Sequence, residues 1–215
     1  MLREDIAEGR TPYGYRVLIG SDLLPREASR VLDVGCGDGV LSRLCAFDGH
    51  TATIVGIDKK DVDLDTQPLP YHDGLFDAVI CLDVVEHVLD PRRLLAEVCR
   101  VLHPDGVLIL ATPNIRWFGY LWAMLWQGRF PRTSYDPVGY DGGHLHYFTY
   151  SDVRALLLEA GFRGIEEFHF SQWNVHHTQW RARGRERLQY LLTSLLGRHL
   201  KLEFFSSSVV VRATK

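Results

Sequence analysis

Short apolar runs alternate with amphipathic stretches along most of the chain. Apolar runs typical of buried strands are found at residues 30–34, 53–58, 76–82 and 107–111. Helical spacing of apolar residues follows the first run up to Phe47. It returns after Asp90 and Pro91, which suit the N-cap and the first helical position. Strands that alternate with helices predict a parallel sheet with helices on both faces.

Two stretches interrupt this alternation. The connection between Asp58 and Phe76 is too short for a full helix and a strand, so we expect a shrunken helix and a short strand near residues 62–64. A long segment at about 115–147 predicts a lid inserted into a single domain of residues 1–215. Beyond it the pattern predicts helices at 151–160 and 185–199 and strands at 164–170 and 204–213.

The strand at 30–34 ends in a glycine-rich turn, because residues 31–39 read VLDVGCGDG. Glycines let a ligand approach the backbone, and the helix after the turn presents free N–H groups to anionic groups. Asp33 ends the buried strand, where a carboxylate needs a cationic or hydrogen-bonding partner. Asp58 ends the next strand and is placed to accept both hydroxyls of a ribose. A glycine turn alone would hold a dinucleotide or merely reverse the chain, but a buried acid disfavours a pyrophosphate.

Residues 31–39 resemble motif I of the class I S-adenosylmethionine-dependent methyltransferases. The resemblance implies a Rossmann-like, doubly wound α/β fold, with a mostly parallel seven-stranded sheet and an antiparallel C-terminal edge hairpin. It implies S-adenosylmethionine as cofactor and S-adenosylhomocysteine as product, with Asp33 pairing with the ammonium of the methionine part. The expected cofactor-binding residues are Asp33, Gly35, Gly37, Asp58, Lys59, Asp63, Leu64 and Leu82, of which Lys59 would lie over the adenine and Asp63 and Leu64 at its edge.

Three polar residues, Asp83, Glu86 and His87, follow the strand at 76–82. One helical turn would put them on one face, at the methyl end of the cofactor. Histidine titrates near neutrality, so His87 is a candidate general base. The pattern is also similar to that of ubiquinone-type O-methyltransferases and small-RNA 2′-O-methyltransferases, which implies a divalent metal ion held by Asp83, Glu86 and His87. Metal-free relatives carry Glu-His here as well, and we expect no bound metal.

Two further histidines, His144 and His146, precede the predicted helix at 151–160. In an extended segment they would face the same side, and either is a candidate catalytic base or an additional metal ligand. The alternative is that they only hydrogen-bond the lid. The stretch is similar to a histidine-containing element, ending in Phe-Thr, of bacterial methyltransferases that act on sugars and cell-surface polymers. Thr149 or Ser151 is expected to cap the helix.

Aromatic residues gather at 115–130, which holds three of the five tryptophans. The stretch is too short to span a bilayer. We expect a lid helix packed on the core. The alternatives are an apolar acceptor pocket and peripheral contact with a membrane that carries a lipid-linked acceptor.

Composition narrows the class of protein. A net charge of −3 argues against nucleic acid as the main partner. The four cysteines lack paired metal spacing, and no secretory or membrane-spanning apolar run is found, so we expect a cytoplasmic protein with reduced cysteines. The sequence thus predicts a methyltransferase that methylates an oxygen of a small or carrier-linked acceptor, such as a sugar, quinone or secondary metabolite. The alternatives are an RNA 2′-O-methyltransferase and a non-catalytic S-adenosylmethionine-binding protein.

Overall fold

The computed structural model describes residues 16–134, 139–169 and 202–215. These residues form a six-stranded sheet in the order β2-β1-β3-β4-β6-β5. The strands are β1 (Arg30–Val34), β2 (Thr53–Ile57), β3 (Phe76–Leu82), β4 (Leu102–Pro113), β5 (Arg163–Phe168) and β6 (Ser208–Thr214). The first four pair in parallel, whereas β6 runs antiparallel to both β4 and β5. The predicted antiparallel edge formed by the last two strands is therefore confirmed.

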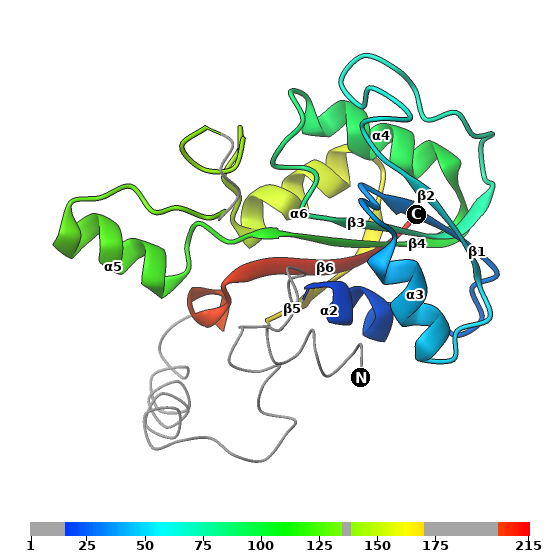
Figure 1. Cartoon of the computed structure of the whole chain (residues 1–215), viewed down its shortest axis with the longest axis horizontal. Helices are drawn as coiled ribbons and strands as arrows, with labels where there is room; N and C mark the ends of the chain where they lie inside the picture. Colours follow the sequence, from blue (N-terminus) through cyan, green and yellow to red (C-terminus); the bar gives the residue numbers. More distant parts are fainter. Residues whose placement is uncertain (1–15, 135–138, 170–201) are drawn as a thin grey trace.

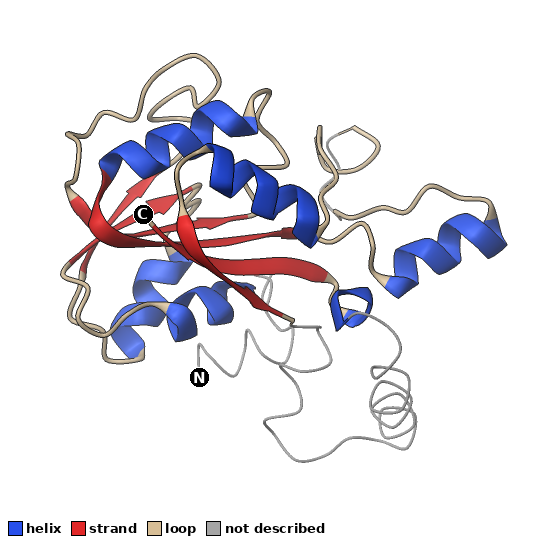
Figure 2. Ribbon diagram, turned by 180° about the vertical axis from the view of Figure 1, so that it is seen from behind, coloured by secondary structure: helices blue, strands red, loops and turns tan. Residues whose placement is uncertain are grey.

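Helices cover both faces of the sheet (Figures 1 and 2). α2 (Arg16–Leu23) and α3 (Val40–Phe47) lie on one face, and α4 (Pro91–Val101) and α6 (Tyr150–Glu159) lie on the other. α5 (Phe118–Gln127) projects from one end of the molecule, and a short 3₁₀ helix (Leu202–Phe205) precedes β6. Among the described helices, none combines the length and the apolar character that crossing a membrane requires.

The core lies on both sides of β3, because its side chains alternate between the two faces of the sheet. Val79 belongs to the buried cluster that includes Leu95 of α4, whereas Ile80 belongs to the one that includes Leu41 of α3. A strand covered on both faces reads as a continuous apolar run. The sequence pattern at residues 76–82 is therefore that of a central strand.

Capping side chains define the starts of two helices that support the site. The Asp90 carboxylate accepts hydrogen bonds from the N–H groups of Arg92 and Arg93, at 3.0 and 3.2 Å. Thr149 and Asp152 form a reciprocal capping box at the start of α6. Both predicted caps, Asp90 and Thr149, are confirmed.

Two predicted elements differ from the structure. Residues 62–64 lie in an irregular connection and form no strand, so the sheet of the described residues has six strands where seven were expected. The last strand begins at Ser208, because the 3₁₀ helix occupies Leu202–Phe205. The helix predicted at 185–199 lies outside the described residues.

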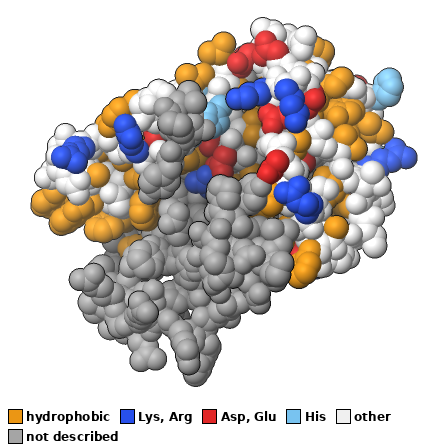
Figure 3. Space-filling model, in the orientation of Figure 1, with side chains coloured by type: hydrophobic (Ala, Val, Ile, Leu, Met, Phe, Trp, Pro, Cys, Tyr) orange, Lys and Arg blue, Asp and Glu red, His pale blue; other side chains and the backbone are white. Residues whose placement is uncertain are grey.

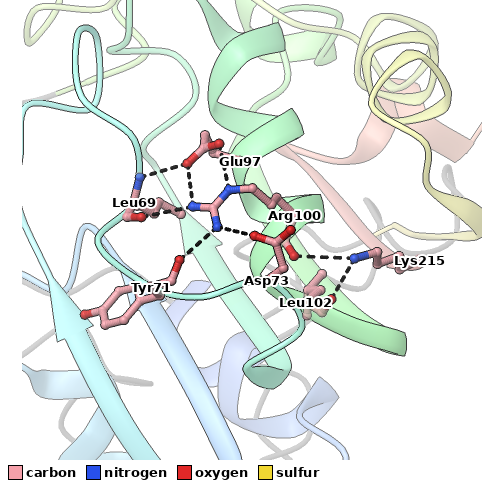
Figure 4. Close-up of polar contacts among 7 residues, drawn as sticks. All are labelled: Leu69, Tyr71, Asp73, Glu97, Arg100, Leu102 and Lys215. Carbon is pink, nitrogen blue, oxygen red and sulfur yellow. Dashed lines mark hydrogen bonds and ion pairs between the residues drawn. The ribbon is translucent and has the colours of Figure 1, made fainter.

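Side chains of α4 fasten the connection between β2 and β3, which has no strand of its own (Figure 4). The Arg100 guanidinium donates hydrogen bonds to the carbonyls of Leu69 and Tyr71, at 3.0 and 2.8 Å. It also pairs with Glu97 at 2.8 Å and with Asp73 at 2.7 Å. These bonds satisfy backbone carbonyls that a regular element would otherwise satisfy, so the connection is held beside the glycine-rich turn without a strand.

Candidate functional site

The glycine-rich turn at the end of β1 joins a buried carboxylate to a left-handed backbone. Gly35, Gly37 and Gly39 have φ values of 76°, 52° and 72°, which residues with a Cβ rarely adopt. A Cβ at Gly35 would also collide with the side chain of Val84. Asp33 is only 4% exposed, and burial together with the nearby Asp58 raises its pKa to about 7. The turn thus places an acid beside backbone that a ligand can approach closely.

Asp58, which follows β2, is tied to the same turn. Its Oδ2 accepts a hydrogen bond from the N–H of Gly37 at 2.9 Å, and its Oδ1 accepts one from the N–H of Lys59 at 2.6 Å. A carboxylate oxygen accepts more than one hydrogen bond, so both oxygens keep capacity for the hydroxyls of a ribose. The structure therefore brings Asp33, the glycine turn and Asp58 together.

The other expected cofactor residues lie in less constrained surroundings. The Asp63 carboxylate closes a turn of its own, because it accepts hydrogen bonds from the Thr66 hydroxyl at 2.5 Å and the Asp65 N–H at 3.0 Å. These bonds lower the pKa of Asp63. Lys59 is exposed, Leu64 is half-buried against the core, and Leu82 is the half-buried last residue of β3. Their part in cofactor binding stays a prediction.

A strained residue opens the polar cluster after β3. Asp83 has a φ of 55°, which is uncommon outside glycine, and its N–H donates to the Ala111 carbonyl at 2.9 Å. Its carboxylate pairs with the guanidinium of Arg16 in α2. The Arg16 Nε also donates to the Ser208 hydroxyl at 2.7 Å. Arg16 therefore links Asp83 to the first residue of β6.

Glu86 is a buried acid with one unpartnered oxygen. The residue is 1% exposed, its Oε2 accepts a hydrogen bond from the Thr112 hydroxyl at 2.9 Å, and its Oε1 has no hydrogen-bond partner in the described part of the chain. Burial raises the pKa of Glu86 well above its ordinary value; Asp83 adds to this effect and Arg16 opposes it. A carboxyl in such a place holds a proton or binds a cation.

Two of the three candidate histidines come together. The rings of His87 and His144 meet edge to face, with centroids 4.6 Å apart. His146 has other partners, because its Nε2 is hydrogen-bonded to the Val88 carbonyl at 3.0 Å and its ring stacks on Phe148 at 5.8 Å. The pair that faces the polar cluster is therefore His87 and His144.

A divalent cation would find three donors at this place. Glu86, His87 and His144 each offer one ligand atom, and these atoms lie within 4.8 Å of one another. Carboxylate and imidazole donors suit zinc or manganese, and the unpartnered Glu86 oxygen fits such a role. The set differs from the expected alternative of Asp83, Glu86 and His87, because Asp83 is paired with Arg16 and His144 takes its place.

Sequence reasoning did not single out three residues that contact this cluster: Arg16, Thr133 and Asp141. The Asp141 carboxylate lies 3.6 Å from Nδ1 of His144, and the Thr133 hydroxyl lies 2.6 Å from the same nitrogen. Asp141 lies three residues before His144, and an acid this close to a candidate histidine is a signal that the sequence carries. Nothing local in the sequence marks Arg16 or Thr133.

The aromatic segment after β4 does not pack on the core as expected. α5 has no buried residue, and it extends away from the sheet (Figure 1). Exposed apolar side chains gather over α5 at that end of the surface, with arginines beside them (Figure 3). The most exposed are Leu125 at 74% and Trp126 at 67%. Trp122 and Trp126 stack on each other at 4.5 Å.

Comparisons with known proteins identify the family of the chain. A family model described as a methyltransferase domain matches residues 13–167. The chain is 32% identical over 194 residues to a ubiquinone biosynthesis O-methyltransferase of Thiobacillus denitrificans, and the match covers 79% of each chain. A protein of the same name from Caulobacter sp. is 34% identical over 113 residues, which is 44% of this chain and only 45% of the relative.

A solved structure supports the fold over nearly the whole chain. The crystal structure of a SAM-dependent methyltransferase from Archaeoglobus fulgidus has a TM-score of 0.60 at 20% identity, and the match covers 94% of this chain and 95% of that one. At this identity the likeness shows a shared fold.

Proposed function

We propose that this chain, which belongs to the methyltransferase-domain family, transfers a methyl group from S-adenosylmethionine to an oxygen of a small or carrier-linked acceptor. One observation carries the proposal: the Asp33 and Asp58 turn and the Glu86 cluster both lie at the carboxyl ends of paired parallel strands. β1 and β3 are neighbours, with Val34 beside Cys81. In open α/β sheets, ligands bind outside this edge.

The cofactor is held by charge and by close backbone approach. The ammonium of the methionine part pairs with Asp33, because a cation favours the charged form of a carboxyl whose pKa burial has raised. Asp58 accepts the ribose hydroxyls, the backbone of Gly35 contacts the methionine part, and the open space beside Gly37 leaves room for it. The remaining residues assigned to the cofactor are Lys59, Asp63 and Leu64 near the adenine and Leu82 at the end of β3.

The transfer itself is a displacement at carbon. The acceptor oxygen forms a bond to the methyl carbon while the methyl–sulfur bond breaks and its electron pair stays on sulfur. The hydroxyl proton passes to His87 or His144, which act as general base. Burial, with His87 adding to it, lowers the pKa of His144, so this ring is neutral near pH 7 and has a free lone pair. His146 is bonded to the Val88 carbonyl and holds the segment in place.

A divalent metal ion is the second way to activate a hydroxyl at this site. Glu86, His87 and His144 would hold it, since their donor atoms are close together and one Glu86 oxygen is unpartnered. Bound there, it would act as a Lewis acid that lowers the pKa of the acceptor hydroxyl. Activity that survives a chelator supports the histidine base, whereas complete loss that added metal reverses supports the metal.

The acceptor class that has most support is a quinone-type ring with a hydroxyl group. The relatives from Thiobacillus and Caulobacter are named for ubiquinone biosynthesis. The match spans only 45% of the length of the relative from Caulobacter. The aromatic surface of α5 favours an apolar acceptor over RNA, as does the net charge of −3.

Cofactor binding and turnover together test the proposal. Calorimetry should show that S-adenosylhomocysteine binds the wild type and Asp38→Ala equally, Asp38 being an exposed acid of the same turn. Asp33→Ala should lose about 2–4 kcal/mol of binding free energy. Mass spectrometry of a prenylated catechol, a sugar and an RNA acceptor should find the methyl group on the catechol. Methylated RNA would favour the RNA enzyme, and binding without any turnover would favour a non-catalytic protein.

Peripheral membrane contact through α5 would bring such an acceptor to the site. Residues 115–134 contain three arginines and no acid, and tryptophan with arginine is typical of helices that lie in a membrane interface. Sedimentation with anionic vesicles should retain the wild type and the control Phe47→Ser, which changes another exposed apolar residue. The double change Trp122→Ser and Trp126→Ser should release the protein. Equal sedimentation of all three would contradict membrane contact through α5.

A further inference from the structure

The Thr133 hydroxyl lies between an acid and a histidine of the site. Its Oγ1 donates to Oδ2 of Asp141 at 2.7 Å and lies 2.6 Å from Nδ1 of His144. Both partners are buried, since the side chains of His144 and Asp141 are 5% and 3% exposed. Such a contact, shielded from water, has one set of hydrogen positions that satisfies all three groups.

The acid fixes the direction of these hydrogen bonds. The Asp141 oxygens face two backbone N–H groups and the Thr133 hydroxyl, all of which donate, so the carboxylate only accepts. Against the effect of burial, these same hydrogen bonds lower the pKa of Asp141. Its Oδ1 accepts from the N–H groups of Thr133 and Ser134, at 2.5 and 2.8 Å. Its Oδ2 takes the single hydroxyl hydrogen of Thr133.

The hydrogen on His144 follows from this. With its own hydrogen given to Asp141, the Thr133 oxygen can only accept, so Nδ1 of His144 must donate to it. A neutral imidazole has one hydrogen, and Nε2 is then left with the lone pair. In water the neutral ring mostly carries its hydrogen on Nε2, so the protein reverses the ordinary preference.

We propose that Thr133 and Asp141 are positioning residues that hold His144 in the form with hydrogen on Nδ1, so that Nε2 is free to accept a proton or bind a cation. The two residues come from the segments that flank residues 135–138 of the lid insertion. Two residues that follow α5 in the chain thus determine which ring nitrogen of His144 carries the hydrogen. This inference deepens the proposed function, but the hydrogen position on His144 does not depend on that function.

Nitrogen-15 NMR of the ligand-free protein tests the hydrogen position directly. At about pH 8, where an ordinary histidine is neutral, the two ring nitrogens differ clearly in shift, and His144→Gln identifies the signals of His144. The wild type and Thr133→Ser should show hydrogen on Nδ1. Thr133→Val, which keeps the shape and removes the hydroxyl, should move it toward Nε2. The exposed Thr51→Val is the matched control and should leave the signals unchanged.

Kinetics give the second readout. Thr133→Val and Asp141→Asn should lower kcat about 10- to 100-fold, as loss of outer partners of functional histidines does. The Kd for S-adenosylhomocysteine should not change, and Thr133→Ser should restore kcat. Melting curves show whether each variant is folded, and Asp141→Asn serves if Thr133→Val is not.

A wild-type His144 with hydrogen on Nε2, or a folded Thr133→Val that keeps both the Nδ1 hydrogen and kcat, overturns the inference. Thr133→Val could shift the His144 hydrogen as expected while neither the wild type nor any variant shows methyl transfer. That result would refute the proposed function and leave the inference standing.

Discussion

Asp33 should make cofactor binding depend on pH. Its pKa is about 7 in the ligand-free protein, raised by burial and by Asp58. If the ammonium of the cofactor pairs only with the ionised form, the affinity follows the ionised fraction. That fraction is about 9% at pH 6 and about 90% at pH 8 for a pKa near 7, so the Kd should fall about tenfold over this range.

The same shift has a defined effect on stability. Below pH 3.8 both the folded and the unfolded chain hold the Asp33 proton, and above about pH 7 neither does. Between these values only the folded chain keeps it, so the free energy of unfolding falls as the pH rises through this window. A shift of about three units corresponds to up to about 4 kcal/mol. Asp33→Asn should therefore stabilise the ligand-free protein at pH 8 while it weakens cofactor binding.

Calorimetry with S-adenosylhomocysteine at several pH values, together with urea unfolding of the ligand-free protein, measures both effects. The matched control is Asp38→Asn, an exposed acid of the same turn, which should keep the wild-type slope of affinity against pH. Asp33→Asn should show weak binding with no such slope. A wild-type affinity that is flat between pH 6 and 8, or a slope that survives in Asp33→Asn, would refute the role of Asp33.

Three further changes have clear expected outcomes. Gly35→Ala should lower the free energy of unfolding by about 2–3 kcal/mol in urea, because the new Cβ would meet Val84 and φ is 76°. Gly37→Ala should lower it by only about 1–2 kcal/mol, because a Cβ at Gly37 would meet no other atom. Arg100→Met should lower the free energy of unfolding by about 2–4 kcal/mol, since it strips two backbone carbonyls and two carboxylates of their partner; an unchanged urea midpoint would contradict this. His87→Ala should lower kcat about 10²–10⁴-fold if this ring is the base, with an unchanged Kd for S-adenosylhomocysteine; an unaltered kcat would exclude it as base.

Local signals account for the parts of the fold that the sequence predicts well. β1 has the predicted bounds because an apolar run and a glycine turn both lie within residues 30–39. The caps at Asp90 and Thr149 are equally local, since each side chain bonds backbone within the next turn. The Asp33 and Asp58 arrangement follows from the rule that neighbouring parallel strands end at the same edge.

The parts that the sequence does not predict depend on contacts between distant residues. Arg16 reaches Asp83 only because α2 packs near the end of β3, and no pattern near either residue announces the pair. His144 and His146 looked equivalent by spacing, yet Thr133 engages one and the Val88 carbonyl engages the other. The exposed face of α5 likewise cannot be read from periodicity, which reports that a face is apolar and not what covers it.

The charges around the site favour a cationic cofactor over an anionic one. Asp58 raises the pKa of Asp33, and Asp83 raises the pKa of Glu86, so the carboxyl ends of β1, β2 and β3 carry acids that repel one another. Burial, with Asp33 and Asp58 adding to it, also raises the pKa of the Cys36 thiol. A dinucleotide would add phosphate charges to this field, whereas S-adenosylmethionine, with an ammonium, a sulfonium and one carboxylate, brings a net positive charge. A cation beside Asp33 would relieve its repulsion with Asp58, so the acids at this edge of the sheet favour such a cofactor over a dinucleotide.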